Sequence, residues 1–312
     1  MKKTILPITV LIPTMNRPQT LKRTLNKYLD SECLPAQIVV VDQSTSEEIA
    51  AEIKRLVEEI RGRIETFYVY QAEPSLTKAR NTAFSYAKHE VIICSDDDID
   101  VYSDTLKQIY NLMSNKQIAM IAGLDDNASE TTSKIGYLLG TKSFSKRNIG
   151  HVTWSMLGRF PNKITEQTDT MWAMGFFFVI RKSLANKWKL MWDEKLTGYA
   201  YAEDLDYTYD YYKKAKAEKL KCIMSNRVHV KHMVSREYRT PTKKSAYMYI
   251  LNRAYLSYKH QMGWKSVVAM RWCNFWRFVE WKIKKQNAEC LKEAMRYWRK
   301  HRLEIQKGDF PY

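Results

Sequence analysis

Cysteine is sparse in this chain of 312 residues, and its five cysteines form no CxxC pair. An odd, scattered set argues against a disulfide scaffold and against a zinc site, and it favours a reducing compartment. Long apolar runs are also lacking, since the densest, GFFFVI at 175–180, is far shorter than the roughly 18 residues of a membrane span. No internal repeat or low-complexity segment is evident. We therefore expect a soluble or peripheral globular protein.

The N-terminal stretch MKKTILPITVLIPT also lacks the features of a secretory signal. Two lysines precede apolar residues there, but Pro7 and Pro13 interrupt the run and no small-residue cleavage site follows. We interpret this stretch as the first strand. The chain is longer than the size at which single cores usually stop growing, which predicts two domains or one domain with an appendage.

Positive charge is unevenly placed along the chain. The formal net charge is +17, and residues 259–307 hold 13 Lys and Arg against 4 Glu, an excess of nine. A basic tail of this kind suggests an anionic partner, which could be nucleic acid or a membrane surface.

The segment RWCNFWRFVEWKIKK at 271–285 has the pattern of a basic amphipathic helix. Its large apolar side chains fall on one face at helical spacing, namely Trp272, Phe275, Trp276, Val279 and Ile283. Such a helix is typical of a membrane interface. Most amphipathic helices of globular proteins instead pack on their own core, so both interpretations stay open.

Strand and helix signals alternate over the first third of the chain. In order, the predicted elements are a strand at 8–14, a helix at 18–29, a strand at 37–45, a helix at 46–61, a strand at 64–72, a helix at 76–89 and a strand at 91–95. This order implies βαβ crossovers, and therefore an α/β fold with a mostly parallel sheet flanked by helices. Residues 123–170 are rich in Ser, Thr, Asn and Gly, which predicts long loops over the ligand site.

The stretch VIICSDDDID, residues 91–100, places acids directly after a short apolar run that predicts a buried strand. Carboxylates this close repel one another, so a cation is expected nearby. Open α/β sheets bind ligands at the carboxyl ends of their strands, and hard cations take carboxylate oxygens. Asp96 and Asp98 are the candidate pair for a divalent metal. The alternative is a solvated acidic turn before a helix capped by Asp104.

Polar residues also follow the first two predicted strands. They are Thr14, Asn16 and Arg17 after the first strand and Asp42 after the second. Each alone is an ordinary turn residue. Because Asp42, Asp96 and Asp98 all follow neighbouring strands, they would line one edge of one sheet. That convergence predicts a nucleotide site with a metal on its diphosphate.

Seven motifs occur in one order, namely IPTMNRPQTL, IVVVDQST, LTKARN, CSDDDID, WAMGFFFVIRKS, WDEKL and YAEDLDY. With them the chain resembles, over roughly residues 4–235, a family 2 glycosyltransferase of bacterial surface-glycan type. The resemblance implies a GT-A fold, a nucleotide-sugar donor, and Mn²⁺ or Mg²⁺ at the DXD element, Asp96 to Asp98. It also implies that Asp42 holds the donor's pyrimidine and that Arg80 lies beside the nucleotide. The other residues expected at the donor nucleotide are Pro13, Thr14, Asn16, Arg17, Asp96 and Asp97.

The chain departs from the family pattern beside two of these motifs. The usual VVDDGS is VVDQST here, with Gln43 and Thr45 in place of Asp and Ser. The glycine that often precedes LTKARN is Ser75. Both departures fall where the base and ribose are expected.

The stretch YAEDLDYTYDYYKK at 201–214 predicts the start of a helix, where the helix dipole favours acidic residues. For Asp206 and Asp210 that explanation suffices. For Asp204 the resemblance implies the catalytic base, because a sugar hydroxyl is a poor nucleophile until a carboxylate takes its proton. Glu203 would hold the acceptor.

Two further pairs of residues leave alternatives open. His229 and His232 lie in VHVKHM, and on a strand they point to opposite faces, so they cannot easily share a metal. Family members often end this strand with a histidine at the metal or diphosphate, which favours His232 as the metal ligand with His229 as the alternate. Trp172 and Met174 precede the core segment FFFVI, and there they could bind the acceptor sugar or simply pack.

The sequence thus predicts an inverting, metal-assisted glycosyltransferase that moves a sugar from a UDP- or dTDP-type donor to a hydroxyl of a surface glycan or a lipid-linked oligosaccharide. The alternative is a metal-dependent nucleic-acid-binding protein or nuclease that uses the acidic cluster and the basic tail. We expect a GT-A domain over residues 1–240 and a basic, Trp-rich helical region over 241–312. The expected location is cytoplasmic, with an anionic surface on the inner face of the cell membrane as a candidate partner of the C-terminal helices.

Overall fold

The computed structural model describes residues 3–128, 134–141, 144–145, 149–161, 164–234 and 241–312. Its first seven elements alternate as predicted, and they are β1 (Thr4–Thr14), α1 (Pro18–Asp30), β2 (Cys33–Asp42), α2 (Glu47–Glu59), β3 (Glu65–Tyr70), α3 (Leu76–Ser85) and β4 (Val91–Ser95). All five residues of β4 are buried, as its continuous apolar run requires. Helices α1 and α2 each bury one apolar face.

The middle of the chain contains shorter elements. In order they are β5 (Ile99–Val101), α4 (Thr105–Met113), β6 (Ile118–Asp125), α5 (Lys134–Leu139), β7 (Phe144–Ser145), β8 (His151–Val152), β9 (Gly158–Pro161), β10 (Gln167–Asp169), β11 (Phe177–Arg181), α6 (Lys182–Lys187), α7 (Glu203–Ala217) and β12 (Lys221–His232). The prediction of long loops over 123–170 is wrong for the described part of that region. A small sheet of order β7-β9-β8 lies there, and its strands of two to four residues are too short for a periodic signal.

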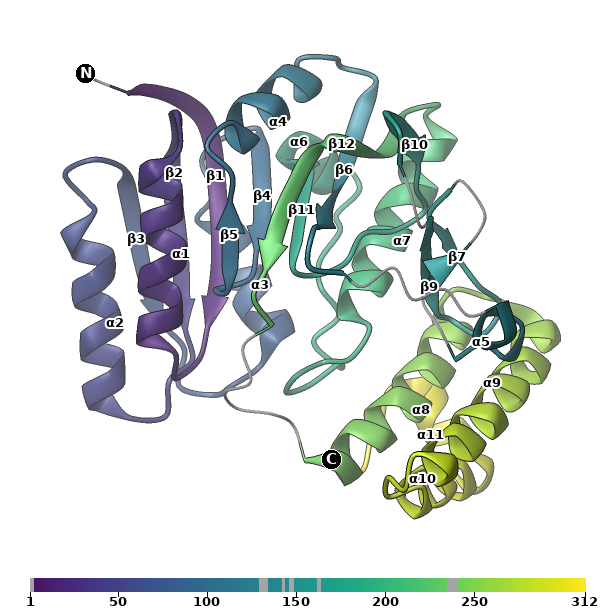
Figure 1. The fold of residues 1–312 in the computed structure, drawn as a ribbon. Coiled ribbons are helices and arrows are strands. Elements are labelled where there is room, and N and C mark those ends of the chain that lie inside the picture. The colour runs from purple at the N-terminus through teal and green to yellow at the C-terminus, as the bar shows by residue number, and fades with distance from the viewer. Residues whose placement is uncertain (1–2, 129–133, 142–143, 146–148, 162–163, 235–240) are drawn as a thin grey trace.

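Within the described residues, the main sheet has nine strands with helices on both faces (Figure 1). Its order is β10-β12-β6-β11-β4-β1-β2-β3, and β5 pairs with β12. Six strands run in one direction, and β5, β10 and β11 run against them. The predicted mostly parallel α/β sheet is therefore confirmed. Thr14 pairs with Asp42 at the ends of β1 and β2, so the carboxyl ends of these strands meet at one edge.

The C-terminal region consists of four helices, α8 (Thr242–Lys259), α9 (Gly263–Ile283), α10 (Glu289–Lys300) and α11 (Arg302–Lys307). They lie together near the end of the sheet toward which β1 and β12 point (Figure 1). Leu291 and Ile305 are buried in the same apolar cluster as Tyr207 of α7. The predicted boundary at residue 240 thus precedes α8, but the two regions share a core. In the described chain, no helix is both long and apolar enough to cross a membrane.

Helix α7 is joined to α8 by a buried charge cluster. Asp206 accepts hydrogen bonds from Lys259 Nζ at 2.7 Å and pairs with His260 Nε2 at 2.8 Å. The Lys259 ammonium also contacts Asp193 at 2.8 Å, and this contact helps to lower the pKa of Asp193 against the effect of burial. Asp206, expected only to favour the helix start, therefore holds the C-terminal helices against α7.

Removal of this carboxylate should destabilise the protein. In Asp206→Ala, Lys259 and His260 lose a buried partner, so we expect the free energy of unfolding to fall by about 2–4 kcal/mol. Glu59→Ala is the control, because its ion pair with Arg55 on α2 is exposed, lies outside the cluster and should be worth less than about 1 kcal/mol. Urea unfolding followed by circular dichroism measures both. Equal losses in the two variants would contradict a structural role for the cluster.

Candidate active site

Three predicted metal ligands lie together at the carboxyl end of β4. The chain leaves β4 at Ser95 and turns into β5, while β12 ends at His232 opposite Ile99 of β5. This pairing brings His232 Nε2 within 3.2 Å of Asp98 Oδ1. One ligand atom from each of Asp96, Asp98 and His232 lies within 4.8 Å of the others. Carboxylate oxygens suit Mn²⁺ or Mg²⁺, and an imidazole is a common ligand of transition metals, so the residues present fit a divalent cation.

The two histidines of β12 have different surroundings. His229 Nδ1 lies 2.8 Å from Asp126 Oδ2, away from the acidic cluster. The ring of His232 stacks on Phe176 with centroids 5.0 Å apart, which fixes its orientation. Burial lowers the pKa of His232, but Asp98, Asp96 and Asp125 together outweigh that effect, so the pKa lies above its ordinary value. The geometry favours His232 over its alternate.

Asp97 does not belong to this ligand group, and it binds residues at the end of β1. It is buried, and it accepts hydrogen bonds from Thr14 Oγ1 at 2.6 Å and from Arg17 at 3.1 Å. Burial raises its pKa to about 7, although Arg17 and Thr14 oppose that change. The middle acid of the motif thus fixes the position of Arg17 at the strand ends.

A cavity of about 400 Å³ opens beside these acids. The predicted donor residues on its wall are Pro13, Thr14, Arg17, Asp96 and Asp97. Gln43 and Ser75, two of the three residues that depart from the family pattern, also line it, and Gln43 Oε1 accepts from Ser75 N at 2.6 Å. Lys244 of α8 and the exposed Tyr199 complete the wall. No sequence signal pointed to Lys244, because it lies more than a hundred residues from the acidic motif.

Asp42 and Asn16 do not reach this cavity. Asp42 is buried and accepts hydrogen bonds from Ser44 N and Ser44 Oγ and from the Tyr68 hydroxyl at 2.8 Å. Asn16 adopts a left-handed φ of 57°, and its Oδ1 accepts from Thr45 N at 2.9 Å. Both side chains therefore hold the turn that follows β2, and the nucleotide contacts expected of them stay predictions. Gln43 takes the position facing the cavity.

Arg80 is buried and bridges two acids on different elements. Its Nε lies 3.1 Å from Glu203 Oε1, and its guanidinium donates to Asp96 at 3.2 Å and to the Gly175 carbonyl at 2.9 Å. Burial opposes its charge, but Glu203 and Asp96 outweigh that effect and raise the pKa of Arg80. Burial also raises the pKa of Glu203 to about 8 against the attraction of Arg80. Arg80 and Glu203 are thus bound to each other, and the expected acceptor contact of Glu203 does not fit its burial.

Asp204 lies in the first turn of α7, next to this pair. Its carboxylate accepts hydrogen bonds from the backbone N–H of Gly175 and of Leu205, both at 2.8 Å. Gly175 permits this approach, because a Cβ there would lie only 3.1 Å from Asp204 Cβ and 3.2 Å from both Arg80 and Glu203. Burial raises the pKa of Asp204 above its ordinary value, against those backbone donors. The carboxylate is therefore held in a fixed position with its pKa shifted toward neutrality.

Trp172 and Met174 take the packing alternative. The ring of Trp172 is only 6% exposed, stacks on Phe160 with centroids 4.3 Å apart, and donates from Nε1 to the Arg159 carbonyl. Met174 is half-buried against the core. The expected acceptor contact of Trp172 is therefore not supported, because its face is already covered.

Solved structures with a similar fold include several glycosyltransferases. S. aureus TarS 1-349 in complex with UDP-GlcNAc is 15% identical with a TM-score of 0.56, over 97% of this chain and 78% of that one. PcManGT, a mannosyltransferase from Pyrobaculum calidifontis in complex with GDP-Man and Mn²⁺, is 13% identical with a TM-score of 0.54, over 95% and 75%. GalNAc-T7 with UDP, GalNAc and Mn²⁺ is 19% identical with a TM-score of 0.56, over 79% and 50%. In two other TarS structures this chain spans 65% and 39% of the chain that it matches.

These likenesses confirm the GT-A fold. A search of curated proteins finds no match. The model of glycosyl transferase family 2, in contrast, matches residues 9–188, more than half of the chain, and those residues include the strand ends, Arg80 and the three aspartates after β4. On that match, and with the fold of its structural neighbours, the chain belongs to glycosyl transferase family 2.

Proposed function

We propose that this protein transfers a sugar, with inversion, from a nucleotide-diphosphate-sugar donor of UDP or dTDP type to an acceptor hydroxyl. The observation that carries the proposal is that one guanidinium, Arg80, joins the metal-ligand candidate Asp96 to the start of α7, where Asp204 lies. A donor diphosphate beside Asp96 and an acceptor beside Asp204 would then meet. TarS has been solved with UDP and with UDP-GlcNAc, and GalNAc-T7 with UDP and Mn²⁺, which supports this donor class.

The donor would occupy the cavity at the ends of β1 and β4. Arg17 and Lys244 place two cations on its wall, where they can attract a diphosphate. Asp96, Asp98 and His232 would hold Mn²⁺ or Mg²⁺, and such an ion supplies charge stabilisation to a leaving diphosphate. Gln43 is fixed through its Oε1, so its amide nitrogen is the group that can face the base.

Asp204 would act as the general base. An inverting transfer needs a carboxylate on the acceptor side that takes the hydroxyl proton as the oxygen attacks. The backbone donors Gly175 and Leu205 hold Asp204 in place. Arg80 and Glu203 lie next to it around Gly175. A single displacement needs no covalent intermediate on the protein.

For the acceptor we propose a hydroxyl of a surface glycan or of a lipid-linked oligosaccharide. Glu203 and Trp172 are buried, so they are not proposed as acceptor contacts. Tyr199 is exposed on the cavity wall and is available to the incoming sugar. A cytoplasmic location at the inner face of the membrane fits an acceptor of this class.

The metal assignment is tested by Asp98→Ala. We expect sugar transfer to be lost and UDP binding in the presence of Mn²⁺ to weaken, because the diphosphate loses a metal ligand. The melting temperature without metal should not fall, since one of several crowded carboxylates is removed. His229→Ala is the matched control, because its ring pairs with Asp126 outside the cluster, and it should bind UDP normally. Full activity of Asp98→Ala in EDTA would show that the assignment is wrong.

The role of Asp204 is tested by Asp204→Asn, which keeps the shape but cannot take a proton. Turnover should fall by roughly 10²-fold or more, while donor affinity measured by calorimetry stays near that of the wild type. Asp210→Asn, a change of the same kind further along α7 at a residue that does not line the cavity, should leave turnover unchanged. Loss of donor binding together with turnover would instead give Asp204 a donor-binding role.

The same base predicts a pH dependence. The pKa of Asp204 is raised by burial, and a base acts only when deprotonated, so activity should be full above that pKa and fall as pH drops through it. We expect the acid limb of kcat/KM to lie above the ordinary Asp value of about 3.9. That limb should be absent from the residual activity of Asp204→Asn. An unchanged limb in the variant would assign it to another group.

A further inference from the structure

Helix α9 exposes an apolar face along its whole length. Trp264 is 73% exposed, Phe275 52% and Ile283 76%, and Val268 and Trp272 lie between them. These residues follow the spacing of one helix face over 21 residues, or roughly 30 Å. We call this set, Trp264, Val268, Trp272, Phe275 and Ile283, the α9 face.

The exposure is not explained by packing within the chain. The buried residues of α9 lie on the opposite side, and they are Ser266, Met270, Cys273 and Asn274. A helix on a protein surface usually turns a polar face to water. Here the side toward the core carries Ser and Asn, whereas the side toward solvent carries Trp and Phe. Of the two interpretations that the sequence left open, packing accounts only for the buried side.

The apolar surface continues beyond α9. Trp272 Nε1 donates to the Leu138 carbonyl of α5 at 3.2 Å, and Leu138 and Ile135 are themselves exposed. Lys265 Nζ lies 5.6 Å from the ring centroid of the exposed Trp154. Exposed apolar side chains from two further segments thus lie beside the α9 face, which is more than the scattered single residues of an ordinary surface.

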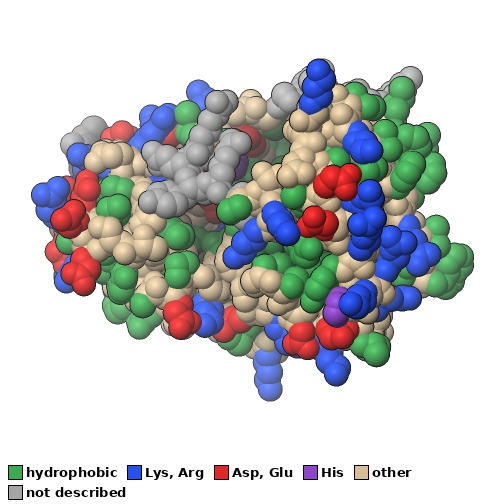
Figure 2. Space-filling model, turned by 90° about the horizontal axis from the view of Figure 1, so that it is seen from below, with side chains coloured by type: hydrophobic (Ala, Val, Ile, Leu, Met, Phe, Trp, Pro, Cys, Tyr) green, Lys and Arg blue, Asp and Glu red, His purple; other side chains and the backbone are tan. Residues whose placement is uncertain are grey.

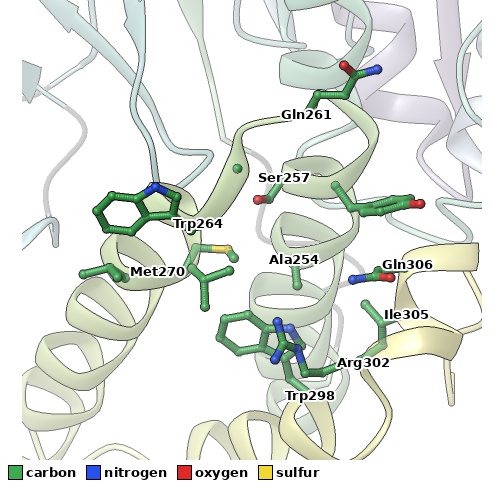
Figure 3. Close-up of a pocket in the computed structure, with 13 residues that line it drawn as sticks. Ala254, Ser257, Gln261, Trp264, Met270, Trp298, Arg302, Ile305 and Gln306 are labelled. Carbon is green, nitrogen blue, oxygen red and sulfur yellow. The ribbon is translucent and has the colours of Figure 1, made fainter.

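Two grooves border α9 on the side that packs against the other C-terminal helices. One, of about 630 Å³, has largely apolar walls, with Trp264 on one side and Ile305 and Trp298 on the other (Figure 3). The second, of about 380 Å³, is lined by Arg271, Lys292 and Arg299 and shares Trp298 with the first. Among the described residues, Arg271 and Arg299 form no ion pair. An apolar groove therefore adjoins a basic one.

We propose that the C-terminal helices bind the surface of an anionic lipid bilayer, with the α9 face in the interface and Arg271, Lys292 and Arg299 on lipid phosphates. Trp and Phe are the side chains favoured at a membrane interface, and basic residues beside them are attracted to anionic lipid. Lys265 and Lys282 flank the face, where their stems can lie along apolar surface.

Charge favours lipid over a second copy of the chain. Of the four glutamates of residues 259–307, three lie within ion-pair distance of a Lys or Arg, and Glu304 lies 3.5 Å from His301 Nδ1. The remaining basic excess would be repelled by an identical surface and attracted by an anionic one. Figure 2 shows hydrophobic, Lys and Arg side chains side by side on the right, where the C-terminal helices lie.

The test uses the full chain and vesicle pelleting, without donor. Wild-type protein should pellet with vesicles of phosphatidylcholine and phosphatidylglycerol and not with phosphatidylcholine alone, and about 1 M salt should weaken binding. The face variant, Trp264→Ser with Val268→Ser and Phe275→Ser, should bind at least about 10-fold more weakly. The groove variant, Arg271→Gln with Lys292→Gln and Arg299→Gln, should lose roughly 10²-fold. All these side chains lie at the surface, so folding should survive.

Control variants remove the same number of charges, or an exposed apolar side chain, elsewhere on the surface. Lys22→Gln with Lys54→Gln and Lys116→Gln removes three exposed cations, and Met191→Ser removes an exposed apolar side chain. Both controls should bind nearly as the wild type does. Equal losses in controls and variants, or no preference of the wild type for anionic vesicles, would overturn the proposal. If light scattering shows a dimer of the wild type and a monomer of the face variant, the α9 face would be assigned to self-association.

The inference is independent of the proposed function, because the face and groove residues lie outside the donor cavity. UDP binding by the face and groove variants should equal that of the wild type. A protein that pellets with anionic vesicles but does not bind UDP would overturn only the proposed function.

Discussion

The site depends on one buried guanidinium. Arg80 of α3 holds Asp96 at the end of β4, Glu203 at the start of α7 and the carbonyl of Gly175, so three segments far apart in sequence meet at one side chain. Neither side of this arrangement is stable alone. A buried guanidinium without acids would lack solvation, and the acids without it would repel each other. The distance between the metal-ligand candidates and Asp204 is therefore set by Arg80, although Arg80 itself does not line the cavity.

The charges of the side chains around the cavity favour the binding of a cation. Around the cavity, the described carboxylates outnumber the cations, since Arg80 serves both Asp96 and Glu203 and Arg17 is bound to Asp97. Burial raises the pKa of Asp96 and of Asp97, which is the sign of charge that lacks enough compensation. A diphosphate adds more negative charge. Donor and divalent cation are therefore expected to enter together, with Lys244 as the additional positive charge on the wall.

Local features of the sequence predicted which strand ends form the site. Acids that directly follow a buried strand must lie at its carboxyl end, and the family resemblance favoured His232 at the end of β12 over His229. It was harder to predict which residue at the end of β2 faces the cavity. Neighbouring residues in an extended chain point to opposite sides, so the choice between Asp42 and Gln43 depends on Ser44 and Tyr68, which bind Asp42 from inside. The burial of Trp172 likewise depends on Phe160 in a sheet too short to predict.

The C-terminal helices could not be placed from sequence, because their contacts join residues more than fifty positions apart. Helix α8 brings Lys244 to the cavity and Lys259 to Asp206 of α7, so it is part of the site's support. Its neighbour α9 packs on it through Met270 while its aromatic face points outward. The basic residues of the C-terminal helices thus form two sets. Lys244 and Lys259 face the cavity and α7, whereas Arg271, Lys292 and Arg299 lie beside the α9 face. Because α8 shares the core of the catalytic sheet, any surface that fixes α9 also fixes the orientation of the cavity.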